Sequence, residues 1–319
     1  MFYTFVKSIF ITIISTISLA ACFEEPKGPI RVGTNIWPGY EPAYIAQDLG
    51  YFANQNVKLN QFQSASESIR AFRNDAVDVV AVTLGEALLL LQDGIDIKVF
   101  LVADISNGGD VILGSPNINN INNLKGHRVG VVGNSLGAYI LVRALEIHKI
   151  PFDAVKLVHL TVDTSEEAFA AGEVDAVVSF EPYRSRLMQN GAREIFSSRE
   201  MPNEIVDILV VRTEYAENNS KELKQFSKAW LKAVNYIVGE PEKAALLVGK
   251  HYQLSPEKAF SSFDGLILPN YDMNVGLLNK TAQINLSDNA LKIEKVLVKH
   301  GLLNAHIPLD DIFTDSYIH

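Results

Sequence analysis

The sequence predicts an α/β fold of two lobes that are joined by two crossings of the chain. Short apolar runs rich in Val and Ile alternate with helical patterns along most of the chain, which is typical of parallel βαβ units. The chain also repeats itself, because Arg31-Val32-Gly33 recurs as Arg128-Val129-Gly130 at an offset of 128 − 31 = 97 residues. A length of 319 residues is sufficient for two such lobes.

The repeat extends over a second pair of segments, 68–80 and 165–177, in the same register. Ser, Ala, Phe, Val, Asp and Val match there without a gap. Two separated segments that share one offset indicate two copies of one α/β unit. Convergence of independent βαβ units on similar patterns is the alternative.

Each copy is predicted to contain three strands and two helices in the same order. The second helix of each copy begins near Ser66 or Thr164. The other predicted elements are strand 31–36, helix 40–50 and strands 56–61 and 77–82 in the first copy, and 128–133, 136–148, 155–160 and 174–179 in the second. Asp78 and Asp175 are expected to be structural and to accept N–H bonds from the turn that precedes each third strand.

Two crossings are predicted between the lobes. The apolar run 97–105 is broken at 107–110 and resumes at 111–114, and the run 205–212 would bring the chain back. These limits assign 30–105 and 208–319 to lobe one and 106–207 to lobe two. The rest of lobe one is predicted to be mostly helical, at 221–238, 240–250, 256–263 and 289–300.

The first residues predict export from the cell. Lys7 precedes an apolar run at 8–18, which is too short for a stable transmembrane helix but is typical of a secretory signal. The segment 19–22, Leu-Ala-Ala-Cys, resembles the bacterial lipoprotein signal, in which the cysteine carries a lipid. We therefore expect a signal peptide at 1–21 and a lipidated tether at 22–29 that anchors the protein to a membrane of the bacterial envelope, on the periplasmic side. An ordinary secretory signal with an incidental Cys22 is the alternative.

Composition and charge narrow the possible functions. The formal net charge of −9 argues against nucleic acid or a broad anionic membrane patch as a partner. Cys22 is the only cysteine, and the seven histidines form no cluster with metal-ligand spacing. No metal and no cofactor are therefore expected.

The loop 35–42 is the first candidate for a binding wall. Pro38 and Gly39 force a turn directly after the first strand, and ligands of α/β sheets bind beyond the carboxyl ends of the strands. Trp37 and Tyr40 place two large rings on this turn, and the repeat makes 132–137 its counterpart in the other lobe. The alternative is a surface turn with Trp37 packed onto its own lobe.

Several ordered segments resemble a known family. They are 31–42, 46–52, 77–87, 124–130 and 172–182. Together they are similar to the solute-binding proteins of the nitrate/sulfonate/taurine-type ABC importers, a family that includes thiamine-pyrimidine precursor binders. The resemblance implies a type II periplasmic-binding-protein fold, in which a small solute is held in a cleft between two closing lobes. It also implies a monomer whose partners are a membrane permease and an ATPase.

Polar and aromatic residues follow the predicted strands at the edge where a solute would bind. Beyond Trp37 and Tyr40, the candidate ligand-binding residues are Thr83, Glu86, Asp110, Asn134, Ser135, Gly137, Phe180, Glu181 and Tyr183. The loop 133–137 precedes a helix, so it either offers free N–H groups to an anionic oxygen or is a plain N-cap.

The acids among these candidates indicate the charge of the solute. Glu86, Asp110 and Glu181 would repel a sulfonate or nitrate in a closed cleft, and no Arg or Lys stands in these loops. We therefore expect a zwitterion or a cation whose protonated nitrogen lies near Trp37 and Tyr40. The alternative is that Glu86 and Glu181 cap the helices that follow them.

Two other functions stay open. Pyrimidine synthases and menaquinone-pathway enzymes share this fold, although the cleft loops contain no nucleophile–base pair. The other alternative is a ligand-sensing subunit for a membrane kinase, which would need a separate partner because the chain has no signalling domain.

Overall fold

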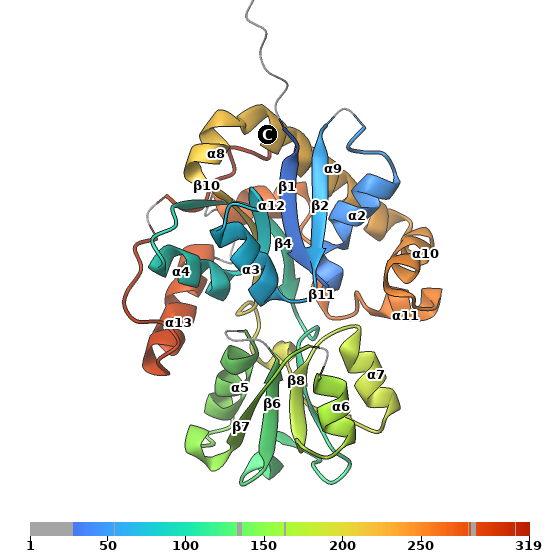
Figure 1. Ribbon diagram of the computed structural model, residues 1–319, viewed down its shortest axis with the longest axis vertical. Coiled ribbons are helices and arrows are strands. Elements are labelled where there is room, and N and C mark those ends of the chain that lie inside the picture. Colours follow the sequence, from blue (N-terminus) through green and yellow to red (C-terminus); the bar gives the residue numbers. More distant parts are fainter. Residues whose placement is uncertain are drawn as a thin grey trace, which may run out of the picture.

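The computed structural model describes residues 28–53, 55–132, 136–162, 164–279, 281, 285–309 and 311–319. The predicted signal peptide and Cys22 lie outside the described residues, as do Asn134 and Ser135. The described chain forms two β-sheets, each flanked by helices, that follow one another along the long axis of the molecule (Figure 1). No helix within these ranges is long and apolar enough to cross a membrane.

The first sheet has six strands in the order β11-β4-β10-β3-β1-β2. β1 runs parallel to both of its neighbours, whereas β10 is antiparallel to β3 and β4. The strands of this sheet are β1 (Ile30–Asn35), β2 (Val57–Phe62), β3 (Val79–Thr83), β4 (Ile97–Ser106), β10 (Val206–Arg212) and β11 (Leu266–Ile267). β3 is buried throughout, as expected for an apolar strand with both faces covered.

The second sheet has five strands in the order β7-β6-β8-β5-β9. β6 runs parallel to both neighbours, and β5 is antiparallel to β8 and β9. Its strands are β5 (Val111–Gly114), β6 (Arg128–Val132), β7 (Lys156–Leu160), β8 (Ala176–Ser179) and β9 (Arg193–Ser197). We call this sheet and the helices beside it lobe two, and the first sheet with its helices lobe one.

The internal repeat is present in three dimensions. The strands β2-β1-β3-β10 and β7-β6-β8-β5 have the same order and relative directions. In each copy the acid before the third strand accepts a backbone N–H bond of 2.8 Å, Asp78 from Arg31 and Asp175 from Arg128. The structural role of both acids is confirmed. The donors, however, lie on the adjacent first strand rather than in the preceding turn, because parallel pairing brings that strand beside the acid.

The helices alternate with the strands in both lobes. They are α2 (Glu41–Asp48), α3 (Ala65–Arg73), α4 (Leu84–Gln92), α5 (Leu136–Ile147), α6 (Ser165–Ala170), α7 (Tyr183–Gln189), α8 (Thr213–Asn218), α9 (Ser220–Gly239), α10 (Pro241–Tyr252), α11 (Pro256–Ser261), α12 (Tyr271–Leu278) and α13 (Leu286–Lys299). α13 begins earlier than predicted because the Asn285 side chain accepts N–H bonds from Ser287 and Asp288. α12 was not predicted, and Asn270 caps it in the same way.

The two crossings lie side by side between the lobes. One leads from β4 into β5, and the other leads from β9 through 198–200 into β10. The Ser106 and Ser198 hydroxyls are 2.8 Å apart, and the Gly108 N–H donates to Ser198 Oγ at 2.6 Å. Gly265 packs against this point with φ +95°, and a Cβ there would stand 2.6 Å from the Gly108 carbonyl carbon. Both the positive φ and the close approach therefore require glycine.

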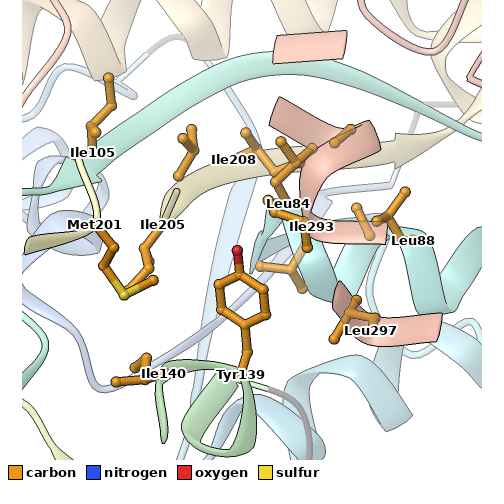
Figure 2. Packing of buried hydrophobic residues seen from close by; sticks show 14 of the residues in the cluster. Leu84, Leu88, Ile105, Tyr139, Ile140, Met201, Ile205, Ile208, Ile293 and Leu297 are labelled. Carbon is orange, nitrogen blue, oxygen red and sulfur yellow. The ribbon is translucent and has the colours of Figure 1, made fainter. Parts of the chain in front are cut away.

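The lobes also contact each other away from the crossings. Figure 2 shows Tyr139 of α5 projecting toward Leu84 of α4 and Leu297 of α13. Glu146 of α5 pairs with Lys299 of α13. Through these contacts, α5 of lobe two packs against α4 and α13 of lobe one.

Candidate functional site

The candidate site is a cavity of about 70 Å³ that residues of both lobes line. Its walls come from the carboxyl ends of β1 and β3, from the segments that begin α3 and α5, and from the crossing before β5. Seven of the predicted site residues line it, namely Trp37, Tyr40, Thr83, Glu86, Asp110, Gly137 and Phe180. Glu181 and Tyr183 are not among the lining residues, and Asn134 and Ser135 lie outside the described residues.

Trp37 forms part of the wall and is also packed onto its own lobe. The chain turns directly after Trp37 in the short helix η1 (Pro38–Tyr40), which leads into α2. Only 6% of Trp37 is exposed, and its Nε1 donates to Asp104 Oδ2 at 2.9 Å. Its ring meets that of Phe180 from lobe two edge to face, with 5.8 Å between centroids. Trp37 is therefore packed onto its own lobe, as the alternative for this loop predicts, and it also lines the cavity, while its contact with a solute stays a prediction.

Gly39 permits this arrangement. A Cβ at this position would overlap the Asp104 carboxylate and stand 2.6 Å from Trp37 Nε1. Any larger residue would therefore separate Trp37 from the acid that holds it.

Tyr40 is held by a second buried acid. Its hydroxyl donates to Asp207 Oδ1, and 2% of the residue is exposed. Burial, followed by the charge of Asp207, raises the pKa of Tyr40 well above its ordinary value. Tyr40 is therefore a neutral hydrogen-bond donor in this site.

Glu86 both caps a helix and lines the cavity. Thr83 N donates to Glu86 Oε2 at 2.9 Å, and Glu86 N donates to Thr83 Oγ1 at 3.2 Å. This reciprocal capping box begins α4 at the end of β3. The helix-capping alternative is therefore confirmed for Glu86, and its carboxylate faces the cavity from that fixed position.

The Glu181 carboxylate caps α7, the helix that follows it in the chain. It accepts from Ser185 N at 3.2 Å and from Ser185 Oγ at 3.0 Å, at the beginning of α7. Tyr183 packs edge to face on Phe180 with 5.5 Å between centroids, and the Arg186 guanidinium lies 4.7 Å from the Tyr183 ring centre. The capping alternative therefore also holds for Glu181, while Tyr183 supports the ring that reaches Trp37.

Two acids that the sequence analysis did not select lie at the base of the site. Asp104 and Asp207 are opposite each other on the antiparallel strands β4 and β10, and both are buried. Asp207 lines the cavity. The sequence did offer a signal for these two acids, because each is a carboxylate inside an apolar run, 97–105 or 205–212. Burial of a carboxylate is costly, so such a residue in a buried strand indicates a specific role.

The acids of the site carry raised pKa values. Burial raises the pKa of Asp104 to about 8, and the charge of Asp110 adds to the effect. Burial raises the pKa of Asp110 to about 7; the hydrogen bond with Ser106 lowers this pKa in part, and the smaller effect of the Glu86 charge raises it. Burial and then the charge of Asp104 raise the pKa of Asp207 well above its ordinary value. For each carboxyl, burial therefore outweighs the hydrogen bonds that favour the ionised form.

No Lys or Arg is among the described residues that line the cavity. Asp104 Oδ1 and Asp110 Oδ2 are buried without a hydrogen-bond partner within the described ranges. Such oxygens are rare in folded proteins, because a buried polar atom without a partner costs about 1–3 kcal/mol. The remaining wall is neutral and polar at Gln63, Ser64 and Ser66, and apolar at Ile140 and Val178.

A single family model matches most of the chain. The model of the family described as NMT1/THI5 like matches residues 37–244. Among characterised relatives, the taurine-binding periplasmic protein of Escherichia coli (strain K12) is 24% identical over 209 residues, which are 63% of this chain and 65% of that protein. A putative aliphatic sulfonates-binding protein of Bacillus subtilis (strain 168) is 28% identical over 225 residues, or 68% of this chain and 67% of that protein. The matches thus span about two thirds of these relatives.

Solved structures show the same fold. The periplasmic aliphatic sulphonate binding protein SsuA from Escherichia coli has a TM-score of 0.73 at 18% identity, covering 92% of this chain and all of that one. The desulfurization enzyme DSZB has a TM-score of 0.66 at 14% identity, covering 90% and 97% of the two chains. The fold is therefore the expected type II periplasmic-binding-protein fold, and the chain belongs to the NMT1/THI5-like family.

Proposed function

We propose that this protein is the extracytoplasmic substrate-binding protein of an ABC importer. It captures a small organic solute by closure of its lobes and delivers the solute to a membrane permease. The family, the names of the relatives as binding proteins and the position of the cavity between two lobes support this function. Ligand-binding proteins of this architecture close around the solute by hinge motion.

The moving units in this proposal are 30–105 with 208–319, and 106–207. The paired crossings at Ser106 and Ser198 would form the hinge, because the chain passes between the sheets there. The contact of Glu146 with Lys299, and that of the Asn289 side chain with the Asn203 carbonyl at 2.7 Å, would form on closure. Opening of the lobes would break such contacts and expose the cavity.

The acidic lining of the cavity is the observation that supports the charge class proposed for the solute. Asp110, Glu86 and Asp207 line it, and the described lining residues include no basic side chain. A bare sulfonate would meet carboxylates without a counter-charge, whereas an ammonium would give the free oxygen of Asp110 a partner. We therefore infer that the solute bears a protonated nitrogen and is a cation or a zwitterion, which distinguishes it from a simple alkanesulfonate.

Each site residue has a role in this proposal. Trp37, Tyr40 and Phe180 contact the organic part of the solute, and Glu86 and Asp110 contact its nitrogen. Thr83 positions Glu86, while Glu181 and Tyr183 position Phe180 through α7. Gly137, in the first turn of α5, contacts the remaining polar end of the solute.

The first experiment is native mass spectrometry of the protein purified without refolding, which identifies a solute that co-purifies. Calorimetry then compares ethanolamine, taurine, ethanesulfonate and nitrate as added ligands. We expect the amines to bind and the two anions to bind weakly or not at all. Tight binding of nitrate or ethanesulfonate without binding of an amine would contradict the proposed charge class.

A catalytic function is the second candidate, because a desulfurization enzyme shares the fold. Incubation of the purified protein with each ligand that binds, followed by mass spectrometry of the small molecules, tests this candidate. Recovery of the unchanged ligand supports a binding protein, and steady turnover supports an enzyme.

We also propose that Cys22 carries a lipid and that the protein is exported and membrane-anchored. The Cys22→Ala variant should then move from the membrane fraction of the cell envelope to the soluble one. An unchanged distribution between the two fractions would favour the ordinary secretory signal.

A further inference from the structure

We propose that the facing carboxyls of Asp104 and Asp207 hold one proton between them, and that this proton leaves when a cationic solute binds. The pair would then determine the charge specificity of the cleft. This inference rests on the proposed function and deepens it, because it names the residues that select a cation over an anion.

The two carboxyls occupy facing positions in the sheet of lobe one. Asp104 on β4 and Asp207 on β10 are register partners on neighbouring antiparallel strands. Directly opposed residues in such a pair have Cβ atoms about 4.5–5.5 Å apart, and like charges there are destabilising. Asp104 is fully buried and Asp207 is 3% exposed, so water screens the repulsion very little.

Neutral donors and other acids surround the pair. Trp37 Nε1 donates to Asp104, and the Tyr40 hydroxyl donates to Asp207. Both donors are neutral, and the charged groups that act on the pair are the acids Asp110 and Glu86. No Lys or Arg is among the described residues that line the cavity beside the pair.

This environment limits the negative charge that the pair can carry. Two buried carboxylates with neutral donors and acidic neighbours do not both ionise readily, so one proton bound by the pair relieves the repulsion. The raised pKa of each carboxyl, caused first by burial, agrees with this geometry. The free oxygen of Asp104, Oδ1, is available to a proton on the pair.

The consequence is an exchange of one positive charge for another. A cationic group that enters the cavity beside Asp207 supplies the counter-charge that the proton supplied before. The proton then passes to solvent, so the solute and the proton change places and the net charge of the site is conserved. An anion offers no such exchange, because its binding would need an additional proton on the pair.

This exchange also links the pair to the binding wall. Asp104 holds the Trp37 ring and Asp207 holds the Tyr40 ring, so the two acids support the two aromatic residues of the loop. Ionisation of the pair strengthens both hydrogen bonds, because charged acceptors bind donors more strongly than neutral ones. Cation binding should therefore make the loop more rigid.

Calorimetry in buffers of different ionisation enthalpy measures the proton release. Ethanolamine, taurine and ethanesulfonate are titrated into the full-length protein in phosphate and in cacodylate, two buffers without an ammonium group, between pH 6 and 7.5. Near pH 6.5 we expect about one proton released from the pair per amine bound, in addition to a fraction of a proton from Asp110, whose pKa is about 7. The affinity should rise by about tenfold or more per pH unit below the range in which the pair ionises.

The Asp104→Asn variant tests the pair. The Asn side chain keeps an oxygen for the Trp37 N–H but leaves Asp207 beside a neutral amide. The pH dependence should therefore move to lower pH, and proton release near pH 7 should fall by at least half. The Asp93→Asn variant at the exposed end of α4 is the matched control and should keep the wild-type profile.

Infrared spectroscopy of the unliganded protein gives a second measurement that needs no solute. The difference spectrum between the wild type and Asp104→Asn at pH 6.5 should contain the carbonyl band of a protonated carboxyl. Absence of that band would overturn the proposal whatever the solute is.

The outcomes separate the two proposals. Amine binding without proton release, or an Asp104→Asn variant that loses affinity equally at every pH, would overturn the shared proton and leave the proposed function intact. Binding of ethanesulfonate with no binding of either amine at any pH would overturn both.

Discussion

Replacement of Asp110 by Asn should make the unliganded protein more stable and its binding of a cationic solute weaker. Asp110 is 1% exposed and lines the cavity, and its Oδ2 has no hydrogen-bond partner among the described residues. Asn has nearly the same shape but cannot ionise. Residues that bind a ligand often destabilise the free protein in this way.

The magnitude follows from the pKa of Asp110, which is about 7 in the folded protein and ordinarily 3.8. The folded state therefore holds a proton that the unfolded state has lost, so stability falls as pH rises from about 4 through 7. At about 1.4 kcal/mol per pKa unit, the cost to the folded state is about 2 kcal/mol at pH 5.5 and about 4 kcal/mol at pH 8. The Asn variant should gain about 2 kcal/mol on the wild type between these two pH values.

Chemical unfolding of both proteins at pH 5.5 and pH 8 measures this gain. The comparison across pH cancels packing differences between Asp and Asn, because those differences do not depend on pH. Calorimetry at pH 8 should show weaker binding of an amine by the variant. A gap in unfolding free energy that does not widen from pH 5.5 to pH 8 would refute the reasoning.

Three further predictions concern the binding wall and the core. Trp37→Ala should weaken solute binding by more than about tenfold in calorimetry. The affinity of Trp37→Phe should lie between those of Trp37→Ala and the wild type, because an aromatic ring remains while the hydrogen bond to Asp104 is lost. Unchanged affinity in both variants would contradict a role of Trp37 in solute binding. Gly39→Ala should weaken binding while far-ultraviolet circular dichroism stays native, because a methyl group there overlaps Asp104; normal affinity would show that the loop can shift. Phe72→Ala should lower the free energy of unfolding by about 3–5 kcal/mol, because the Phe72 side chain is fully buried. If chemical unfolding showed a decrease of less than about 1 kcal/mol, the buried position of Phe72 in the core would be contradicted.

Local pattern was sufficient for the repeat and for the elements in it. Strand and helix periodicity depends on residues close in sequence, so the βαβ order and the shared register were predicted from the sequence and are present in both sheets. The place of Trp37, Tyr40, Glu86 and Asp110 at the cavity was also predictable. Each follows a strand end or a break in a strand, and such ends meet at one edge of a parallel sheet.

The hydrogen-bond partners of the site residues could be identified only from the tertiary structure. Glu181 follows a strand as Glu86 does, yet its carboxylate turns to Ser185 in α7, a choice that depends on local side-chain geometry. Asp104 and Asp207 are far apart in the chain and look alike in their apolar runs. They meet because the returning strand β10 inserts between β3 and β4 in antiparallel register, and strand order of that kind is a long-range property. The sequence by itself determined the two copies, the loop and the acidic character of the cleft, and only the sheet topology decided which acids face each other beneath the aromatic wall.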